Sequence, residues 1–308
     1  MSWLVLVAIA VIFDSLRIFI DNYVSDVYFK GRGSASQKLF YGYFFIAAAV
    51  ILFLIFGIDF EHTTFANLAW IFVAGILSTV AGIPYYRALE YEDSTTLSIF
   101  IQLAPVLYLV LGWLFLGEQF EPAQLIAFAV ILAGPMVIIF SGRKNGRQAT
   151  MGAVVMAAIY ILISVTGNLI FVKNNSCDLI FTTPMMVLFL GKGLSNLAIM
   201  YGVPKYRRRF LTVLKKNRKK LLRTLCVDGV VSLIKDFAYR GTLILAPTVA
   251  IASAVSDSVE PIVIFVMGII LTLIWPKFGR EKLTKKAVLT HLIATVLVVT
   301  GIVILQVI

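Results

Sequence analysis

Charged residues are scarce in this sequence. Only 14% of its 308 residues are Asp, Glu, Lys or Arg, whereas 60% are hydrophobic. Since a water-soluble domain carries about 25% charged residues, this composition excludes an ordinary soluble domain. We therefore expect the chain to lie in a lipid bilayer.

Cysteine and histidine are equally rare. Two cysteines, Cys177 and Cys226, provide neither a disulfide framework nor the paired spacing of a zinc site. His62 and His291 lie far apart in the sequence and have no neighbouring ligand residues. The sequence also has no P-loop motif. We therefore expect no metal, no cofactor and no direct use of ATP.

Long apolar runs dominate what is present. A hydrocarbon core of about 30 Å takes roughly 20 apolar residues to cross as a helix, and runs this continuous predict helices rather than barrel strands. The sequence thus predicts an all-α membrane protein with ten transmembrane helices. Their predicted spans are Trp3–Ile20, Leu39–Ile58, Ala66–Leu89, Ser94–Leu116, Pro122–Ser141, Met151–Val172, Leu179–Tyr201, Thr224–Leu245, Thr248–Trp275 and Lys286–Ile308.

The basic residues gather on one predicted side. They lie in the segments after predicted helices one, five, seven and nine, whereas the opposite side offers little beyond Lys173 and Arg240. Because basic loops face the cytoplasm, this distribution places both termini outside. We expect an integral, multi-pass protein of the plasma (cell inner) membrane.

The richest basic segment, residues 203–223, spaces Phe210, Leu214, Leu221 and Leu225 at near-helical intervals between cations. This pattern suits a helix that lies on an anionic leaflet and senses lipid or binds a partner. The simpler interpretation, which we favour, is a topology anchor. The run has little aromatic interleaving for stacking on bases, so we expect no nucleic-acid partner.

The chain divides into two similar halves, residues 1–141 and 150–308. Each half has a helix with a mid-membrane proline, then a polar turn, then a further helix. In this alignment Pro105 corresponds to Pro261, and "GEQFEP" corresponds to "REKLTK". Weak internal repeats of this kind are typical of transporters.

Ten apolar helices in two halves, "YYRAL" at the end of helix three, the helix-four proline and "LGEQF" before helix five resemble the EamA-like members of the drug/metabolite transporter superfamily. The resemblance covers nearly the whole chain. It implies two inverted five-helix repeats, transport of a small organic metabolite, and a homodimer formed through helices five and ten. The family usually has both termini in the cytoplasm, which differs from the orientation that the loop charges predict here.

The stretch "AVSDSVEP" places two carboxylates inside predicted helix nine. A charge at the bilayer centre costs roughly 2.5–3.5 kcal/mol on insertion scales, so such residues need a reason. Ser253, Ser256, Asp257 and Glu260 are spaced i, i+3, i+4, i+7 and form one polar stripe, which must face protein or water. Pro261 frees a backbone carbonyl near Asp257. We expect these acids to bind a solute or a proton.

Polar residues also occur in several of the remaining predicted helices. Asp14 and Arg17 lie one turn apart and are predicted to pair, and Lys235 could neutralise an acid of helix nine. Structural ion pairs that touch no substrate are the competing interpretation. The predicted substrate-binding or proton-coupling residues are Asp257, Glu260, Ser253, Ser256, Asp14, Arg17, Lys235, Asp236, Tyr239, Gln102, Ser98, Tyr85 and Lys192.

We expect a secondary transporter that moves an amine, an amino acid or a similar metabolite by alternating access, with proton-coupled export as its expected form. Transport of an anionic phosphorylated metabolite stays open because of Lys192, Lys235, Arg87 and Arg240. Two different functions compete with transport: a membrane enzyme acting on lipid head groups, and a non-transporting scaffold built on residues 203–223. Close helix packing is expected at the glycines Gly112, Gly134, Gly167 and Gly301.

Overall fold

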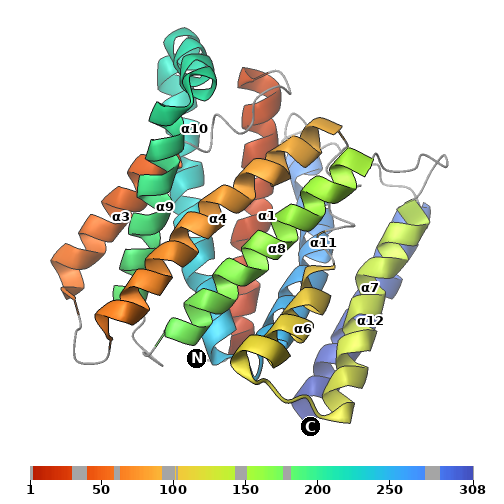
Figure 1. Ribbon diagram of the computed structural model, residues 1–308. Helices are drawn as coiled ribbons and strands as arrows, with labels where there is room; N and C mark the ends of the chain where they lie inside the picture. The colour runs from red at the N-terminus through yellow and green to blue at the C-terminus, as the bar shows by residue number, and fades with distance from the viewer. Residues whose placement is uncertain are drawn as a thin grey trace.

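The computed structural model describes residues 3–29, 40–58, 63–91, 101, 103–142, 151–175, 182–274 and 285–307. Helices are the only regular structure in this part of the chain, as predicted (Figure 1). They are α1 (Trp3–Tyr28), α3 (Tyr41–Phe56), α4 (Phe65–Tyr91), α6 (Ala104–Leu116), α7 (Pro122–Gly142), α8 (Met151–Asn174), α9 (Thr182–Gly202), α10 (Pro204–Leu245), α11 (Val249–Ile274) and α12 (Lys285–Val307).

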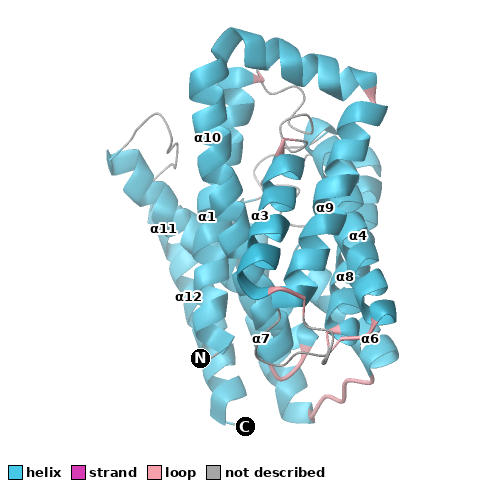
Figure 2. Ribbon diagram, turned by 90° about the vertical axis from the view of Figure 1, so that its left-hand side faces the viewer, coloured by secondary structure: helices cyan, strands magenta, loops and turns pink. Residues whose placement is uncertain are grey.

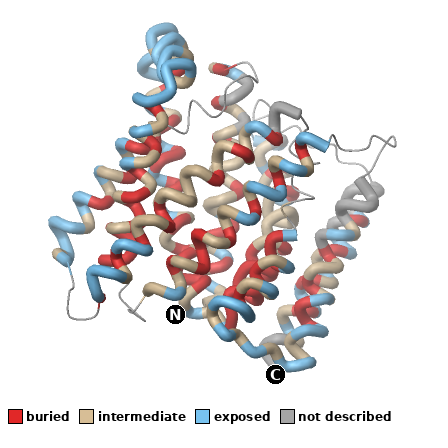
Figure 3. Tube along the Cα trace, in the orientation of Figure 1, coloured by how far each residue is buried: buried red, intermediate tan, exposed pale blue. Residues whose placement is uncertain are grey.

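Five of the described helices are long and apolar enough to cross a membrane: α1, α4, α8, α9 and α11. Shorter apolar helical segments lie in α3, α6, α7 and α12. Large apolar side chains cover the outside of the bundle; Leu54, for example, is 75% exposed and Ile126 is 62% exposed. Figure 3 shows buried residues along the middle of the bundle and exposed ones around it. So much outward apolar surface fits a protein surrounded by lipid.

Helix α10 differs most from the prediction. The basic segment expected to be a loop is helical and continuous with predicted helix eight, which gives one helix of 42 residues. Proline is tolerated in the first turn of a helix, where Pro204 lies, and no further proline follows in α10. Figure 2 shows that the first part of α10 crosses the top of the bundle before the helix turns down beside α1.

The apolar side of this basic part packs onto the protein. Phe210, Leu221 and Leu225 are buried in one core cluster, and Phe40 stacks on Phe210 with ring centroids 5.8 Å apart. These apolar side chains are therefore covered by the protein rather than free to enter the leaflet. The cations at Lys215, Lys216, Arg218, Lys219 and Lys220 are exposed.

The two predicted mid-helix prolines lie in different places. Pro261 lies inside α11, as predicted. Pro105 lies in the first turn of α6, because the described helix begins at Ala104 rather than at Ser94. The predicted site residues Ser98 and Gln102 fall outside the described residues.

The helices pack in pairs that join the two halves of the chain. α1 packs on α10 and α11, α4 packs on α8 and α9, α3 packs on α9, α6 packs on α8 and α11, and α7 packs on α12. Both termini lie at one end of the bundle, opposite the basic first part of α10 (Figure 1). The termini and the basic residues of α10 are thus at opposite ends, as the charge distribution predicts.

Three of the four predicted packing glycines do lie at helix contacts. A Cβ on Gly134 of α7 would lie 3.0 Å from the carbonyl oxygen of Ala294 in α12, and one on Gly301 would lie 3.0 Å from that of Ala127. A Cβ on Gly167 of α8 would lie 3.2 Å from the Cβ of Leu77 in α4. Gly112 is different, because a Cβ there would meet the side chain of Glu118 rather than another helix.

Helix α9 uses glycine on both sides of Lys192. A Cβ on Gly191 would overlap the carbonyl oxygen of Phe72 in α4, and one on Gly193 would lie 3.1 Å from the carbonyl oxygen of Gly42 in α3. These two glycines let α4 and α3 approach α9 closely at the depth of Lys192.

We expect Gly191→Ala to lower the thermal unfolding midpoint of the purified protein by several degrees, because overpacking of this kind costs about 1–3 kcal/mol. The matched control is Gly202→Ala at the end of α9, where a Cβ meets nothing within 4 Å. Equal midpoints for the two variants would contradict the close α4–α9 approach.

Candidate functional site

A chain of alternating charges crosses the interior from α1 to α9. Arg17 pairs with Asp14 at 2.6 Å and with Asp21 at 3.2 Å. Lys235 of α10 pairs with Asp14 at 3.2 Å and lies 3.9 Å from Asp236. The predicted Asp14–Arg17 pair is confirmed. The ion pairs of Lys235, however, are formed with α1 and with its own helix rather than with an acid of α11.

The chain of charges ends at Lys192, which forms an ion pair with Asp236. The ammonium of Lys192 also lies 5.1 Å from the centroid of the Phe45 ring, within range of a cation–π contact. Asp236 is 9% exposed. At this burial each charge needs its partner, because an unpaired ion loses its hydration without compensation.

We expect Lys192→Met to destabilise the protein by about 3–5 kcal/mol, the usual cost of leaving one member of a buried pair behind. The carboxylate of Asp236 then retains only Lys235 at 3.9 Å, so adding Asp236→Asn should recover part of that loss. Thermal unfolding of the single and double variants measures both effects. Additive losses in the double variant would show that the two residues do not act as a pair.

The polar stripe of α11 faces the interior. Ser253 is fully buried and Ser256 is 4% exposed, while Asp257 and Glu260 are partly buried. Ser253 Oγ donates a hydrogen bond to Asp257 Oδ2 at 2.8 Å. The expectation that this stripe avoids lipid is confirmed by the burial of its serines.

Glu260 lies one turn beyond Asp257 on the same helix. Its carboxyl group interacts electrostatically with Asp14, Asp257, Lys235 and Arg17. Within the described part of the chain it forms no ion pair or hydrogen bond. The acids of α11 therefore lie close enough to the ion pairs of α1 and α10 to interact with them electrostatically.

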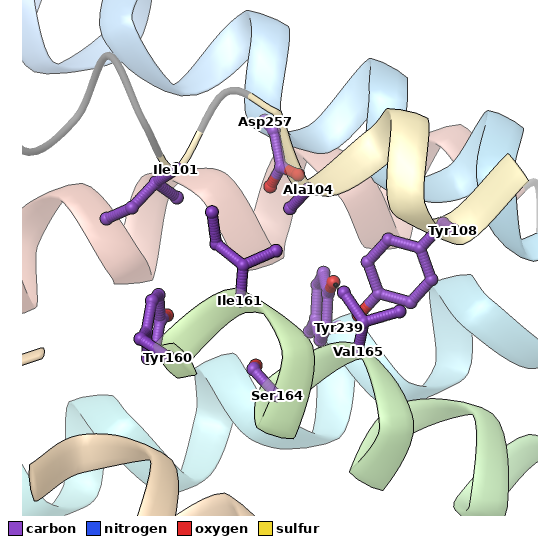
Figure 4. A pocket seen from close by; sticks show the side chains of 9 residues that line it. All are labelled: Ile101, Ala104, Tyr108, Tyr160, Ile161, Ser164, Val165, Tyr239 and Asp257. Carbon is purple, nitrogen blue, oxygen red and sulfur yellow. Dashed lines mark hydrogen bonds between the residues drawn. The ribbon is translucent and has the colours of Figure 1, made fainter. Parts of the chain in front are cut away.

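Asp257 borders a small cavity of about 60 Å³ between α6, α8, α10 and α11. Figure 4 shows its carboxyl group pointing toward side chains from the other three helices. Three tyrosines line the cavity: Tyr108 from α6, Tyr160 from α8 and Tyr239 from α10. Ser164 of α8 adds a hydroxyl. A carboxylate surrounded by aromatic rings suits a cation.

Hydrogen bonds connect the cavity tyrosines. Asn168 of α8 donates to the hydroxyl of Tyr108, whose oxygen lies 3.4 Å from that of Tyr239. The ring of Tyr85 in α4 lies 5.2 Å from that of Tyr160, centroid to centroid, which places Tyr85 beside the cavity. These contacts hold the rings in fixed orientations around the space.

Sequence reasoning missed four of these residues: Tyr108, Tyr160, Ser164 and Asn168. Three of them carry a signal that could have revealed them, since Tyr160, Ser164 and Asn168 follow one another at i, i+4, i+8 on a mostly apolar helix. Tyr108 stands alone in α6 and carries no such signal.

The "LGEQF" motif has a clear structural role. Gly117 ends α6 in the left-handed conformation, with φ 69°. The chain then turns so that Glu118 Oε1 accepts the backbone N–H of Val249, the first residue of α11, at 2.6 Å. A carboxylate at this position satisfies a free helix donor and interacts favourably with the helix dipole. A loop of the first half thus caps a helix of the second.

Burial raises the pKa of Glu118, while the N–H groups of Val249 and Ala250 act in the opposite direction. A raised pKa in the folded state means that stability is highest at low pH and is lost as the pH rises from 4.5 through the raised value. We expect the unfolding midpoint of Glu118→Gln to lack this decline, since glutamine keeps an acceptor without a charge. Parallel pH dependences in the two proteins would contradict this account.

Arg240, which the charge distribution assigned to the side of the membrane opposite the basic loops, lies in the interior of the bundle. It lies inside α10 and is 3% exposed. Its Nη2 donates to Ser78 Oγ of α4 at 3.2 Å, and its guanidinium carbon lies 4.8 Å from the centroid of the Phe171 ring. Arg87, by contrast, is exposed.

Among the described residues no three His, Cys, Asp or Glu side chains are placed to hold a metal ion.

Comparison with known proteins identifies the first half of the chain. Residues 2–140 match the EamA-like transporter family. The resemblance inferred from "YYRAL" and "LGEQF" is therefore confirmed over these residues.

The fold of the whole chain is similar to solved structures, of which 27 chains match. One, described as "Crystal structure of protein", has a TM-score of 0.65 and 15% sequence identity; the alignment covers 98% of this chain and 96% of that one. At this identity the similarity extends to the fold alone. No curated protein matches the sequence.

Proposed function

We propose that this EamA-like protein is a secondary active transporter that moves a small cationic or zwitterionic metabolite, such as an amine or an amino acid, by alternating access. The observation that carries the proposal is the carboxyl group of Asp257, which faces a cavity lined by Tyr108, Tyr160 and Tyr239. An ammonium group would pair with the carboxylate and lie against the rings.

The cavity lies where both halves of the chain meet. Tyr108 comes from the first half, whereas Tyr160, Tyr239 and Asp257 come from the second. Its volume of about 60 Å³ is well below the roughly 300–1,000 Å³ of ligand pockets. This size suits an occluded conformation, in which the helices must separate before a solute enters.

The helix pairing supports two inverted repeats, residues 1–141 and 150–308. In a repeat of this kind, α1, α3, α4, α6 and α7 correspond in order to α8, α9, α10, α11 and α12. When each helix is replaced by its counterpart, the α1–α10 contact becomes the α4–α8 contact. The same exchange turns α1–α11 into α6–α8 and maps α3–α9, α6–α11 and α7–α12 onto themselves. We propose that these ten helices cross the plasma membrane.

Proton coupling is supported by the surplus of acid on α11. Asp14 is neutralised by Arg17 and Lys235, so a single cationic solute at Asp257 leaves Glu260 without a counter-charge among the described residues. A carboxyl group in this position would bind a proton and release it when the cavity opens to water. Export would then exchange the solute for a proton.

A phosphorylated anion fits this interior less well. A phosphate dianion needs several cations that are free to bind it. Lys192 and Lys235 are held by Asp236 and Asp14, and Arg87 is exposed, so Arg240 alone of these four cations is buried with N–H groups that have no acceptor among the described residues. A scaffold function also loses support, since the apolar side of the basic part of α10 is covered by the protein.

We expect proteoliposomes containing the protein to give substrate-dependent currents on a solid-supported membrane when tested with a panel of amines and amino acids. Asp257→Asn should raise the half-saturating substrate concentration roughly ten- to hundredfold, because a charge-assisted contact contributes about 1.5–3 kcal/mol. Glu260→Gln should keep substrate binding but remove the dependence of transport on a pH gradient.

The matched control is Glu121→Gln, the same change at an exposed loop position. Its currents should equal those of the wild type. Currents that survive Asp257→Asn unchanged would move the binding site away from the cavity. A wild-type protein that gives no current with any member of the panel would contradict transport of this class of solute.

A further inference from the structure

Arg240 is a buried cation whose hydrogen-bonding capacity is largely unused. Apart from the bond from Nη2 to Ser78, its Nε and Nη1 groups are buried and have no acceptor among the described residues. Phe171 covers one face of the guanidinium. A guanidinium cannot lose its charge in a protein, and its removal from water without acceptors is costly.

The neighbouring carboxylate does not relieve this cost. Asp236 lies one turn earlier on α10, where it pairs with Lys192 and approaches Lys235 to 3.9 Å. Three cations, Lys192, Lys235 and Arg240, thus interact electrostatically with Asp236. Since Asp14 is shared between Arg17 and Lys235, it adds no free acceptor here. No carboxylate among the described residues accepts a hydrogen bond from Nε or Nη1 of Arg240.

We infer that Arg240 binds a small monovalent anion, which accepts hydrogen bonds from the guanidinium N–H groups that the protein leaves without an acceptor. Phe171 and Ser78 hold the guanidinium in place for this contact. A planar guanidinium can donate two parallel hydrogen bonds to the two oxygens of a carboxylate. A halide ion can accept hydrogen bonds from the same N–H groups at its single atom.

The site lies beside the Asp257 cavity. Arg240 directly follows the cavity residue Tyr239 in α10, and Tyr108 and Tyr239 each interact electrostatically with both Arg240 and Asp257. Asp257 lines the cavity, whereas Arg240 lies next in the chain to its lining residue Tyr239. The anion is either a free ion such as chloride or the carboxylate of a transported solute; the second source rests on the proposed function.

The test uses thermal unfolding of the purified full-length protein in detergent. A bulky sulfonate salt is replaced stepwise by sodium chloride in one series and by sodium acetate in another, at constant ionic strength. An anion that binds only the folded protein raises its unfolding midpoint in a saturable way. We expect a rise of several degrees in the wild type and none in Arg240→Gln.

Two further variants make the result specific. Arg87→Gln, the same change at an exposed position, should keep the full rise. Arg240→Lys keeps the charge but not the planar fork, so it should keep a smaller rise at a higher anion concentration; it also serves if Arg240→Gln does not fold. Saturation with acetate alone would identify a carboxylate site, and saturation with chloride as well would identify a site for free anions.

Midpoints that do not change in either series, or an equal saturable rise in Arg240→Gln, would overturn the inference and indicate that water fills the position. The readout requires no transport. A protein that binds the anion but carries no solute would therefore refute the proposed function and leave this inference standing.

Discussion

The contact between α1 and α10 organises the interior of this protein. It brings Asp14 and Arg17 of one helix against Lys235 and Asp236 of the other, in a setting where an isolated charge is not tolerated. Each charge is acceptable only because its neighbour is present, so the two helices are held in one register. That register places Lys235 against Asp14, and Tyr239, one turn further along α10, beside the cavity.

Much of the fold can be predicted from the sequence, because a membrane helix must satisfy its own backbone and therefore appears as a continuous apolar run. The ends of α7, α9 and α11 lie within a few residues of their predicted positions. The near-helical spacing of Phe210, Leu221 and Leu225 indicates a helix at the start of α10. It does not indicate that this helix packs its apolar side onto the protein and continues into the next predicted helix.

The candidate site also contains some features that local sequence predicts and others that it does not. The stripe on α11 is visible in the sequence because two carboxylates in an apolar run demand an explanation, and the Asp14–Arg17 pair follows from helical spacing. The partners of Lys235 and the roles of Tyr108 and Glu118 depend on which helices meet, and that information does not lie in local sequence. Arg240 lies within the predicted helix Thr224–Leu245, but its enclosure by α4 and α8 likewise depends on which helices meet.

The pairing of helices across the halves also bears on how the protein is made. The main described contacts of α1, α3, α4, α6 and α7 are all with helices that follow residue 150. A ribosome therefore delivers the first half to the membrane before its packing partners exist. During that interval Asp14 lacks Lys235, and the carboxylate of Glu118 lacks the helix that it caps. The first five helices therefore reach the membrane without most of the contacts that they have in the folded protein.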